Sequence, residues 1–261
     1  MKLSVITINY NNRIGLEKTL KSIVMQSSKD FEWIVIDGGS TDESKKLIER
    51  NNDLITYWIS EPDDGIYNAM NKGIKVSKGD YLLFLNSGDC FYNSNVIESF
   101  YEYSGNEDII YGDIMYENQT GAHRKQSLYK EHITICDFWN HTIPHQASFI
   151  KKTAFEKYGY YNEEIKVSAD WFFFIKSIIV GGASYKHIDL TVSVMQPDGV
   201  STKRTYGNEI KYLESIIPRR ILCDIPKAVS LTEIQQVPIC AFMYKGIYKL
   251  AILIKRIKRI V

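Results

Sequence analysis

Acidic and amide side chains follow an apolar run of this sequence in an arrangement that suits metal-assisted binding of a phosphate. The run at residues 81–85 is followed at once by Asn86, Ser87, Gly88 and Asp89. Carboxylate and amide oxygens bind divalent cations such as Mg²⁺, and the cation in turn binds phosphate oxygens. Polar side chains lie at or near the ends of three earlier apolar runs as well: Thr7 with Asn9, Asp37 alone, and Glu61 with Asp63 and Asp64.

The four apolar runs have the length and continuity of parallel strands that are buried on both faces. They cover residues 3–8, 31–36, 55–59 and 81–85, and segments with apolar residues at helical spacing separate them at 13–26, about 40–50 and 66–76. Ser40 and Glu43 have the spacing of a capping box, which places the start of the second helix at Ser40. The alternation predicts an α/β fold with a mostly parallel, Rossmann-like sheet flanked by helices. Because parallel strands end at one edge of such a sheet, we expect the polar groups to line one crevice.

The second part of the chain is less regular. Helices are expected at residues 96–103, 152–158, 171–180 and 208–217, and strands at 108–116, 123–128 and 185–195. We therefore expect one α/β domain over residues 1–205 and a helical C-terminal extension over residues 206–261.

Charge is distributed unevenly along the chain. The net charge is +1, but residues 240–261 hold six Lys and Arg and no acid, so the remainder carries about −5. A mildly acidic body argues against nucleic acid as a partner. The four cysteines are widely spaced and form no CxxC pair, which is typical of unlinked thiols in a reducing compartment. With no secretory signal and no apolar run of the roughly 18–20 residues that span a bilayer, these features predict a cytoplasmic protein.

The basic C-terminal segment has a pattern of its own. Residues 238–261 interleave apolar side chains with Lys and Arg. This pattern predicts an amphipathic helix that lies peripherally on the anionic cytoplasmic face of the inner membrane. A helix packed on the protein body, or a contact between two copies, is the alternative.

Two common nucleotide-binding devices are absent from the sequence. The loop after the first run reads NYNN and has no glycine, so it is not the GxGxxG turn of a dinucleotide-binding unit. The P-loop pattern GxxxxGK[ST] does not occur either. A nucleotide would therefore have to be held by side chains on its base and a metal ion on its diphosphate.

Four stretches carry a resemblance to a known family: SVITINYNN, IVIDGGSTD, SEPDDGIYNAMNKGI and GDYLLFLNSGD. In this order they resemble the family 2 inverting glycosyltransferases of the GT-A fold, and the bacterial branch that builds O-antigen and capsule most of all. The resemblance covers roughly residues 1–200. It implies transfer, with inversion, of a sugar from a nucleotide-diphosphate sugar, expected to be a UDP-sugar, to a carbohydrate or lipid-linked saccharide.

The resemblance also implies which residues bind the donor and its metal. Asn86–Asp89 occupies the place of the family's DxD motif but keeps only one of its acids. Asp89 is therefore the expected ligand of a divalent cation, Mg²⁺ or Mn²⁺, with Asn86 as a second candidate ligand; the alternative for Asp89 is a helix-capping acid. The residues expected to contact the donor nucleotide or sugar are Thr7, Asn9, Asp37, Asp64, Gly65, Asn68, Asn71, Ser87 and His145.

Asp170, in the stretch SADWFFFIK, matches the place of the family's catalytic acid. Inverting transfer needs a carboxylate that takes the proton of the attacking hydroxyl, within hydrogen-bond reach of it. The alternative for Asp170 is a helix N-terminal carboxylate that interacts favourably with the helix dipole. Glu163 and Glu164 are nearby rivals for the role of base.

Three other functions remain open from the sequence. The reduced metal motif would also fit a non-catalytic nucleotide-sugar-binding partner of another transferase. A nucleotide-sugar or NAD-dependent oxidoreductase is disfavoured by the missing glycine fingerprint. A retaining transferase differs from the expected enzyme in the anomer of its product.

Overall fold

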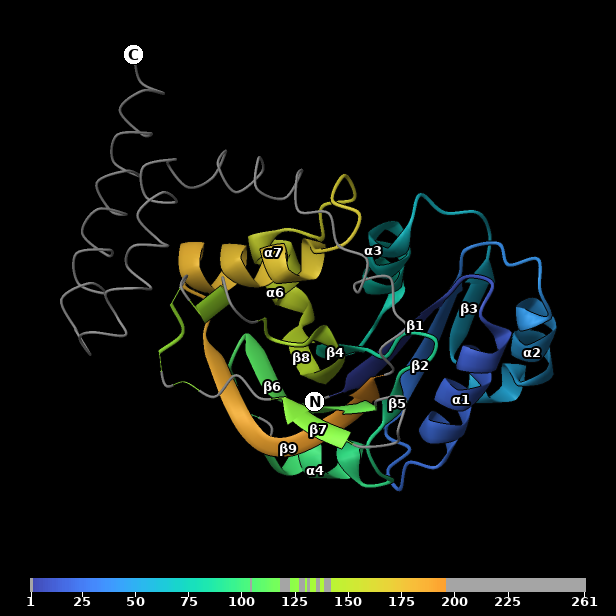
Figure 1. The fold of residues 1–261 in the computed structure, drawn as a ribbon, viewed down its shortest axis with the longest axis horizontal. Helices are drawn as coiled ribbons and strands as arrows, with labels where there is room; N and C mark the ends of the chain where they lie inside the picture. Colours follow the sequence, from blue (N-terminus) through green and yellow to red (C-terminus); the bar gives the residue numbers. More distant parts are fainter. Residues whose placement is uncertain are drawn as a thin grey trace, which may run out of the picture.

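The computed structural model describes residues 2–103, 105–117, 123–126, 130, 132–134, 137–138 and 142–195. Over these ranges the chain forms one mixed sheet with helices on both faces (Figure 1). The strands are β1 (Leu3–Asn9), β2 (Phe31–Asp37), β3 (Tyr57–Ser60), β4 (Tyr81–Phe84), β5 (Cys90–Phe91), β6 (Ile109–Glu117), β7 (His123–Gln126), β8 (Ser148–Lys151) and β9 (Tyr185–Met195). The α-helices are α1 (Arg13–Val24), α2 (Ser44–Arg50), α3 (Ile66–Val76), α4 (Val96–Tyr103), α6 (Lys152–Tyr158) and α7 (Ala169–Phe174).

The first half of the sheet is parallel, in the order β3-β2-β1-β4. Its register pairs Asn9 with Asp37, and Asp37 with Ser60. The polar strand ends thus lie side by side at one edge of the sheet, and the prediction of a helix-flanked, mostly parallel sheet is confirmed.

Side chains alternate between two cores, one on each face of the sheet. Ile6, Ile34 and Leu82 pack with residues of α3, α6 and α7. Val5, Val35 and Leu83 face the other way and pack with residues of α1, α2 and α4. Figure 1 shows α3, α6 and α7 grouped above the sheet and α4 below it. Burial on both faces explains why the parallel strands read as continuous apolar runs.

The second half of the sheet reverses direction. Strand β8 pairs antiparallel with β4 and with β6, and β9 then runs parallel to β6. Strands β5 and β8 were not predicted, because they contain only two and four residues and show no extended pattern. Strand β8 matters for function, since it follows directly on the short 3₁₀ turn His145–Ala147.

Two helix predictions need correction. The second helix begins at Ser44, not at Ser40. The Ser40 hydroxyl oxygen instead accepts hydrogen bonds from the Asn11 backbone N–H (2.8 Å) and the Asn9 amide (3.1 Å) and donates its hydrogen to Asp37 (2.5 Å), so it does not cap a helix. The helix predicted at 171–180 is α-helical only over Ala169–Phe174 and continues as a π-helix over Ile175–Val180.

Several predictions fall outside the described residues. These are the helical extension at 206–261, including its helix at 208–217, the basic amphipathic segment at 238–261, and the end of the 1–205 domain. Among the residues that are described, no helix has both the length and the apolar character that crossing a membrane requires.

The contact between α3 and β1 allows a test of the packing. A Cβ at Gly73 would lie 2.5 Å from Cγ2 of Ile6, which is fully buried. We expect Gly73→Ala to lower the free energy of unfolding, because overpacking costs about 1–3 kcal/mol and outweighs a helix-propensity gain of about 1 kcal/mol. Urea denaturation measures the change. Lys75→Ala, at an exposed position on the same helix, is the control, and its free energy of unfolding is expected to lie within about 0.5 kcal/mol of that of wild type. A Gly73→Ala variant as stable as this control would contradict the close contact between α3 and β1.

Candidate active site

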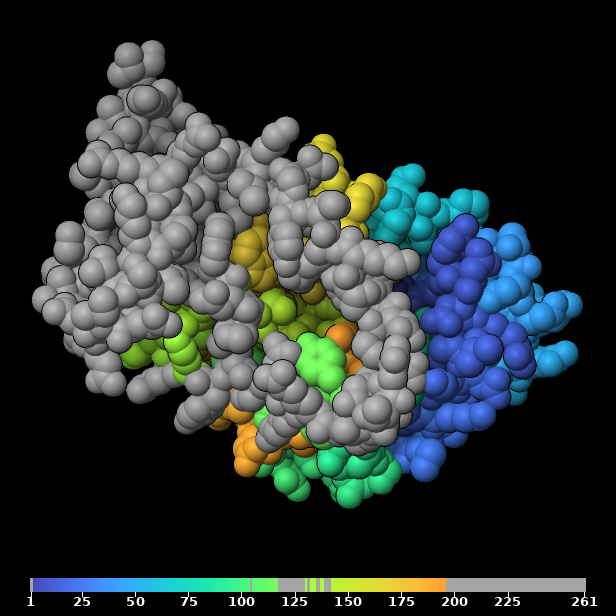
Figure 2. Space-filling model, in the orientation of Figure 1, coloured from blue at the N-terminus to red at the C-terminus, as the bar shows by residue number. Residues whose placement is uncertain are grey.

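A cleft of about 1080 Å³ opens at the carboxyl edge of the parallel strands. Loops after β1, β2, β3 and β4 line one side of it, and residues of the second half of the sheet line the other. Figure 2 shows the first β/α units in blue on the right, with the later elements, in green to orange, to their left. The predicted site residues that line the cleft are Asn9, Gly65, Asn86, Ser87, Asp89, His145 and Asp170.

The Asp37 carboxylate holds the loops on the donor side of the cleft together. It is fully buried and accepts hydrogen bonds from the side chains of Asn9 (2.7 Å), Ser40 (2.5 Å) and Ser60 (2.7 Å). The backbone N–H of Ser40 donates to it as well, at 3.0 Å. With these four hydrogen bonds Asp37 organises the loops, and it does not itself line the cleft as the nucleotide-contact prediction required.

Thr7 does not reach the cleft either. Its side chain is fully buried and accepts a hydrogen bond from the Trp33 indole N–H at 3.0 Å. Alternate residues of a strand point to opposite faces of the sheet. Thr7 therefore faces the core shared with α1 and α2, whereas the next polar residue, Asn9, lies at the strand end beside the cleft.

Two further predicted contacts, Asn71 and Asn68, act as structural anchors. Asn71 donates to Tyr161 O (2.9 Å) and to Glu163 (2.8 Å), and Asn68 donates to the other Glu163 oxygen (2.8 Å). These bonds attach α3 to the loop before α7 and lower the pKa of Glu163, which is thus not a free base. Asp64 is exposed and lies outside the cleft lining; its neighbour Asp63 lines the cleft instead.

The loop after β4 is held rigidly from α1 and from the β1 loop. Ser87 donates to Asn9 Oδ1 at 2.7 Å, and the Asn12 amide donates to Ser87 O at 3.0 Å. The buried Thr19 hydroxyl donates to Asp89 O (2.7 Å) and accepts from Gly88 N–H (3.0 Å). Gly88 has φ +109°, a backbone conformation that favours glycine. These hydrogen bonds thus fix the conformation of the loop in the absence of a ligand.

Asp89 presents a nearly buried carboxylate to the cleft, rather than capping α4. It is 8% exposed, and burial raises its pKa to about 6, an effect that nearby His145 and Gln146 only partly offset. Asn86 Oδ1, three positions earlier, is buried with no hydrogen-bond partner. No three His, Cys, Asp or Glu side chains in the described ranges could hold a metal ion by themselves. One carboxylate and one unpartnered amide oxygen nevertheless fit a cation that takes its other ligands from a diphosphate and water.

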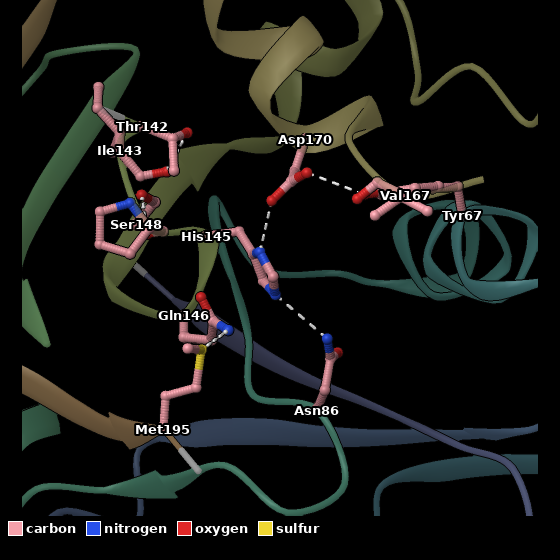
Figure 3. Close-up of polar contacts among 11 residues, drawn as sticks. Tyr67, Asn86, Thr142, Ile143, His145, Gln146, Ser148, Val167, Asp170 and Met195 are labelled. Carbon is pink, nitrogen blue, oxygen red and sulfur yellow. Dashed lines mark hydrogen bonds and ion pairs between the residues drawn. The ribbon is translucent and has the colours of Figure 1, made fainter. Parts of the chain in front are cut away.

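Asp170 lies across the cleft at the start of α7, and both of its oxygens are engaged (Figure 3). Tyr67 donates to Oδ1 at 2.8 Å, and His145 Nδ1 lies 2.7 Å from Oδ2. Burial acts to raise the pKa of Asp170, but the hydrogen bonds from His145 and Tyr67 outweigh it and hold the pKa below the usual value. The side chain is 14% exposed and remains a carboxylate at neutral pH.

His145 joins the two sides of the cleft. Its Nε2 lies 3.2 Å from Asn86 Nδ2, so the imidazole lies between Asp170 and the loop after β4 (Figure 3). The adjacent Gln146 is buried and donates to Met195 Sδ at 3.1 Å.

Sequence reasoning missed other residues that line the cleft, among them Tyr10, Lys18 and Tyr67, whereas Asp63 was named only as one of the polar groups expected along the crevice. Tyr10 is an aromatic residue that is 66% exposed at the mouth of the cleft. Its position directly after the first predicted strand could have identified it as a residue of the cleft. Tyr67 lay in a helix and carried no such signal, because its partner Asp170 is 103 positions away.

Comparison with known proteins decides the family. The model of glycosyl transferase family 2 matches residues 4–159. The chain belongs to this family.

Two curated relatives agree with this assignment. An uncharacterized glycosyltransferase of Mycobacterium tuberculosis is 35% identical over 182 residues, which are 68% of this chain and 69% of that protein. The PGL/p-HBAD biosynthesis glycosyltransferase of Mycobacterium bovis is 31% identical over 185 residues, which are 66% of this chain and 68% of the relative.

Solved structures with the same fold include two complexes with nucleotide sugars. Staphylococcus aureus TarS 1–349 in complex with UDP-GlcNAc superposes with a TM-score of 0.65 at 20% identity, over 79% of this chain and 62% of that one. The mannosyltransferase PcManGT from Pyrobaculum calidifontis, in complex with GDP-Man and Mn²⁺, gives 0.56 at 16% identity, over 74% and 56%. The family 2 glycosyltransferase described here thus has the GT-A fold.

The hydrogen bond from Tyr67 to Asp170 predicts a shift in pH dependence. Tyr67→Phe removes a donor that stabilises the carboxylate, so the pKa of Asp170 rises. If the reaction needs the ionised acid, the acidic limb of the kcat profile, measured at saturating donor and Mn²⁺ so that Asp89 stays ionised, moves to higher pH. Tyr160→Phe, a half-exposed tyrosine outside the cleft, is the control. An unshifted limb in Tyr67→Phe would contradict the assignment.

Proposed function

We propose that this family 2 enzyme transfers a sugar, with inversion, from a UDP-sugar to a carbohydrate or lipid-linked saccharide in the synthesis of a cell-surface glycan. The TarS complex with UDP-GlcNAc supports the choice of uridine, and the relative named for PGL/p-HBAD biosynthesis supports a role in the synthesis of a glycan.

One observation carries the proposal: two carboxylates in opposite electrostatic situations share a single cleft. Burial raises the pKa of Asp89 to about 6, and no Lys or Arg is among the groups that lower it. Asp170 is held as an anion by two donors. The first is suited to bind a cation with the donor diphosphate, and the second to accept a proton.

The proposed step is a single displacement. An acceptor hydroxyl oxygen forms a bond to the anomeric carbon, and the bond from this carbon to the diphosphate oxygen breaks on the opposite face. The electron pair of the broken bond leaves with the nucleoside diphosphate, and the hydroxyl proton passes to a carboxylate oxygen of Asp170. Attack from the opposite face inverts the configuration at the anomeric carbon.

Asp89, assisted by Asn86 Oδ1, would hold the divalent cation, Mg²⁺ or Mn²⁺. The cation, when bound, stabilises the negative charge that develops on the departing diphosphate. The donor-side loops contribute the remaining contacts to the nucleotide. Tyr10 offers an exposed ring for stacking on the base, and Asn9, Asp63 and Ser87 offer polar atoms within the same cleft.

Nucleotide binding tests the metal role of Asp89. We expect calorimetry to show Mn²⁺-dependent binding of UDP that weakens at least tenfold in Asp89→Asn, because a charged ligand is lost. Binding of GDP in parallel tests the choice of base. The exposed Asp53→Asn, outside the cleft, is the matched control and is expected to bind as wild type does. Equal binding by Asp89→Asn and wild type would remove Asp89 from the metal site.

Protons compete with the cation for Asp89, which gives a second test. The raised pKa of about 6 means that the carboxyl is neutral below this pH. Metal-dependent affinity for UDP should therefore be constant well above pH 6 and fall by about tenfold per pH unit below it. Affinity that remains flat down to pH 5 would show that Asp89 is not the group that binds the cation.

Asp170→Asn tests the base. The variant keeps the shape of the side chain but removes its basicity, so kcat should fall roughly 10²–10⁴-fold while UDP affinity changes little. The exposed Glu164→Gln, a rival acid nearby, is expected to retain wild-type kcat. A non-catalytic nucleotide-sugar-binding partner is the second candidate; it would bind UDP and show no turnover with any donor. The presence of both Asp89 and Asp170 in the cleft disfavours this alternative.

A further inference from the structure

A continuous row of polar contacts crosses the cleft from one carboxylate to the opposite loop. Tyr67 donates to Asp170 Oδ1 at 2.8 Å, Asp170 Oδ2 lies 2.7 Å from His145 Nδ1, and His145 Nε2 lies 3.2 Å from Asn86 Nδ2 (Figure 3). The imidazole is only 17% exposed, so water does not replace these contacts readily.

The direction of the hydrogen bonds follows from the Asn86 amide. An amide nitrogen only donates hydrogen bonds, so His145 Nε2 must supply a lone pair to it. Against the effect of burial, Asp170 and Asp89 hold the pKa of His145 above its ordinary value, so the imidazole is neutral only at alkaline pH; its single hydrogen then lies on Nδ1 and is donated to Asp170 Oδ2. In this arrangement Asp170 only accepts hydrogen bonds, which is what a base requires before it takes a proton.

The carboxylate is fixed at three points. Oδ1 and Oδ2 accept from Tyr67 and His145, and the Trp171 backbone N–H also donates to the carboxylate. A carboxylate has about four lone-pair positions. About one acceptor direction therefore stays open, and His145 and Tyr67 determine where it points.

We propose that His145 is a positioning residue for Asp170, and that the Asn86 amide selects the His145 tautomer that aims the carboxylate at the acceptor hydroxyl. The inference rests on the proposed role of Asp170 as the base. It assigns Asn86 a function that a carboxylate at this place could not serve, because a carboxylate offers no hydrogen to Nε2.

The tautomer can be observed without any substrate. The full-length protein labelled with ¹⁵N-histidine has five histidines, and the His145 signals are assigned by their loss in His145→Gln, with His132→Gln as a second assignment variant. At pH 8 we expect the ¹⁵N shifts of His145 to report a hydrogen on Nδ1 and none on Nε2. A hydrogen on Nε2 in wild type would overturn the inference.

Asn86→Asp reverses the contact while it keeps the shape of the side chain. Its carboxylate accepts a hydrogen bond, so Nε2 should gain a hydrogen and the Nδ1-only signature should be lost. kcat should fall about tenfold or more, although the added acid strengthens metal-dependent UDP binding. Retention of the Nδ1-only signature, or a kcat equal to or above that of wild type, would contradict the role of Asn86.

Kinetics separates positioning from proton transfer through the imidazole. Turnover is measured as nucleotide release from UDP-glucose, UDP-galactose, UDP-GlcNAc or GDP-mannose, whichever wild type consumes. In His145→Ala we expect kcat to fall about 100-fold, the cost of a base displaced by about 1 Å, with the donor KM within about threefold. His145→Gln, which has one donor and one acceptor but no basic nitrogen, should recover at least tenfold of this loss. A Gln variant as slow as the Ala variant, or an unchanged kcat in His145→Ala, would refute positioning.

The outcomes distinguish this inference from the proposed function. Melting temperatures and UDP affinities of the His145 variants close to wild type would show that they fold. Full activity in Asp170→Asn, or no turnover of any donor by wild type, would defeat the proposed function whatever the His145 tautomer is. An inactive Asp170→Asn beside a fully active His145→Ala would defeat only the inference.

Discussion

The buried carboxylate of Asp37 is the constraint on which the donor side of the cleft depends. A fully buried charge is costly unless hydrogen bonds compensate it, and here four donors from three loops converge on it. One of these donors, Asn9, in turn accepts from Ser87, which fixes the loop that carries Asp89. The position of Asp89, the proposed ligand of the cation, is thus determined by an acid that does not line the cleft.

Two kinds of structure meet in the active site. The donor side is built from loops at the ends of parallel strands, which the sheet register brings together. The opposite side, which carries the proposed base, is built from a helix start and a 3₁₀ turn, which are placed by antiparallel strand pairing and by apolar packing against α3. The Asp170–His145 contact, 25 positions apart in sequence, and the His145–Asn86 contact, 59 positions apart, join these parts.

The sequence predicted the parallel half of the fold well because each of its strands is a nearly continuous apolar run between segments of helical spacing. It failed where a long-range contact overrode a local pattern. Ser40 has the spacing of a helix cap, but its hydroxyl is hydrogen-bonded to Asn9, Asn11 and Asp37 instead. Strand β8 is too short to be detected, and its pairing with β4 and β6 exists only in three dimensions. For the site, the sequence located the loops but not the direction of each side chain. It predicted a nucleotide contact for Asp64, whereas Asp63 lines the cleft. It also predicted a donor contact for Asn71, whereas both the nitrogen and the oxygen of this amide are hydrogen-bonded to the Tyr161 backbone.

The match to the family model ends at residue 159, before Asp170, whereas Tyr67 and His145 lie inside it. These two side chains hold the Asp170 carboxylate from two separate elements, α3 and the 3₁₀ turn before β8. Tyr67 and His145 each form a hydrogen bond with one oxygen of this carboxylate. Because its two partners come from different elements, a substitution that shifts α3 relative to this turn would also displace the Asp170 carboxylate.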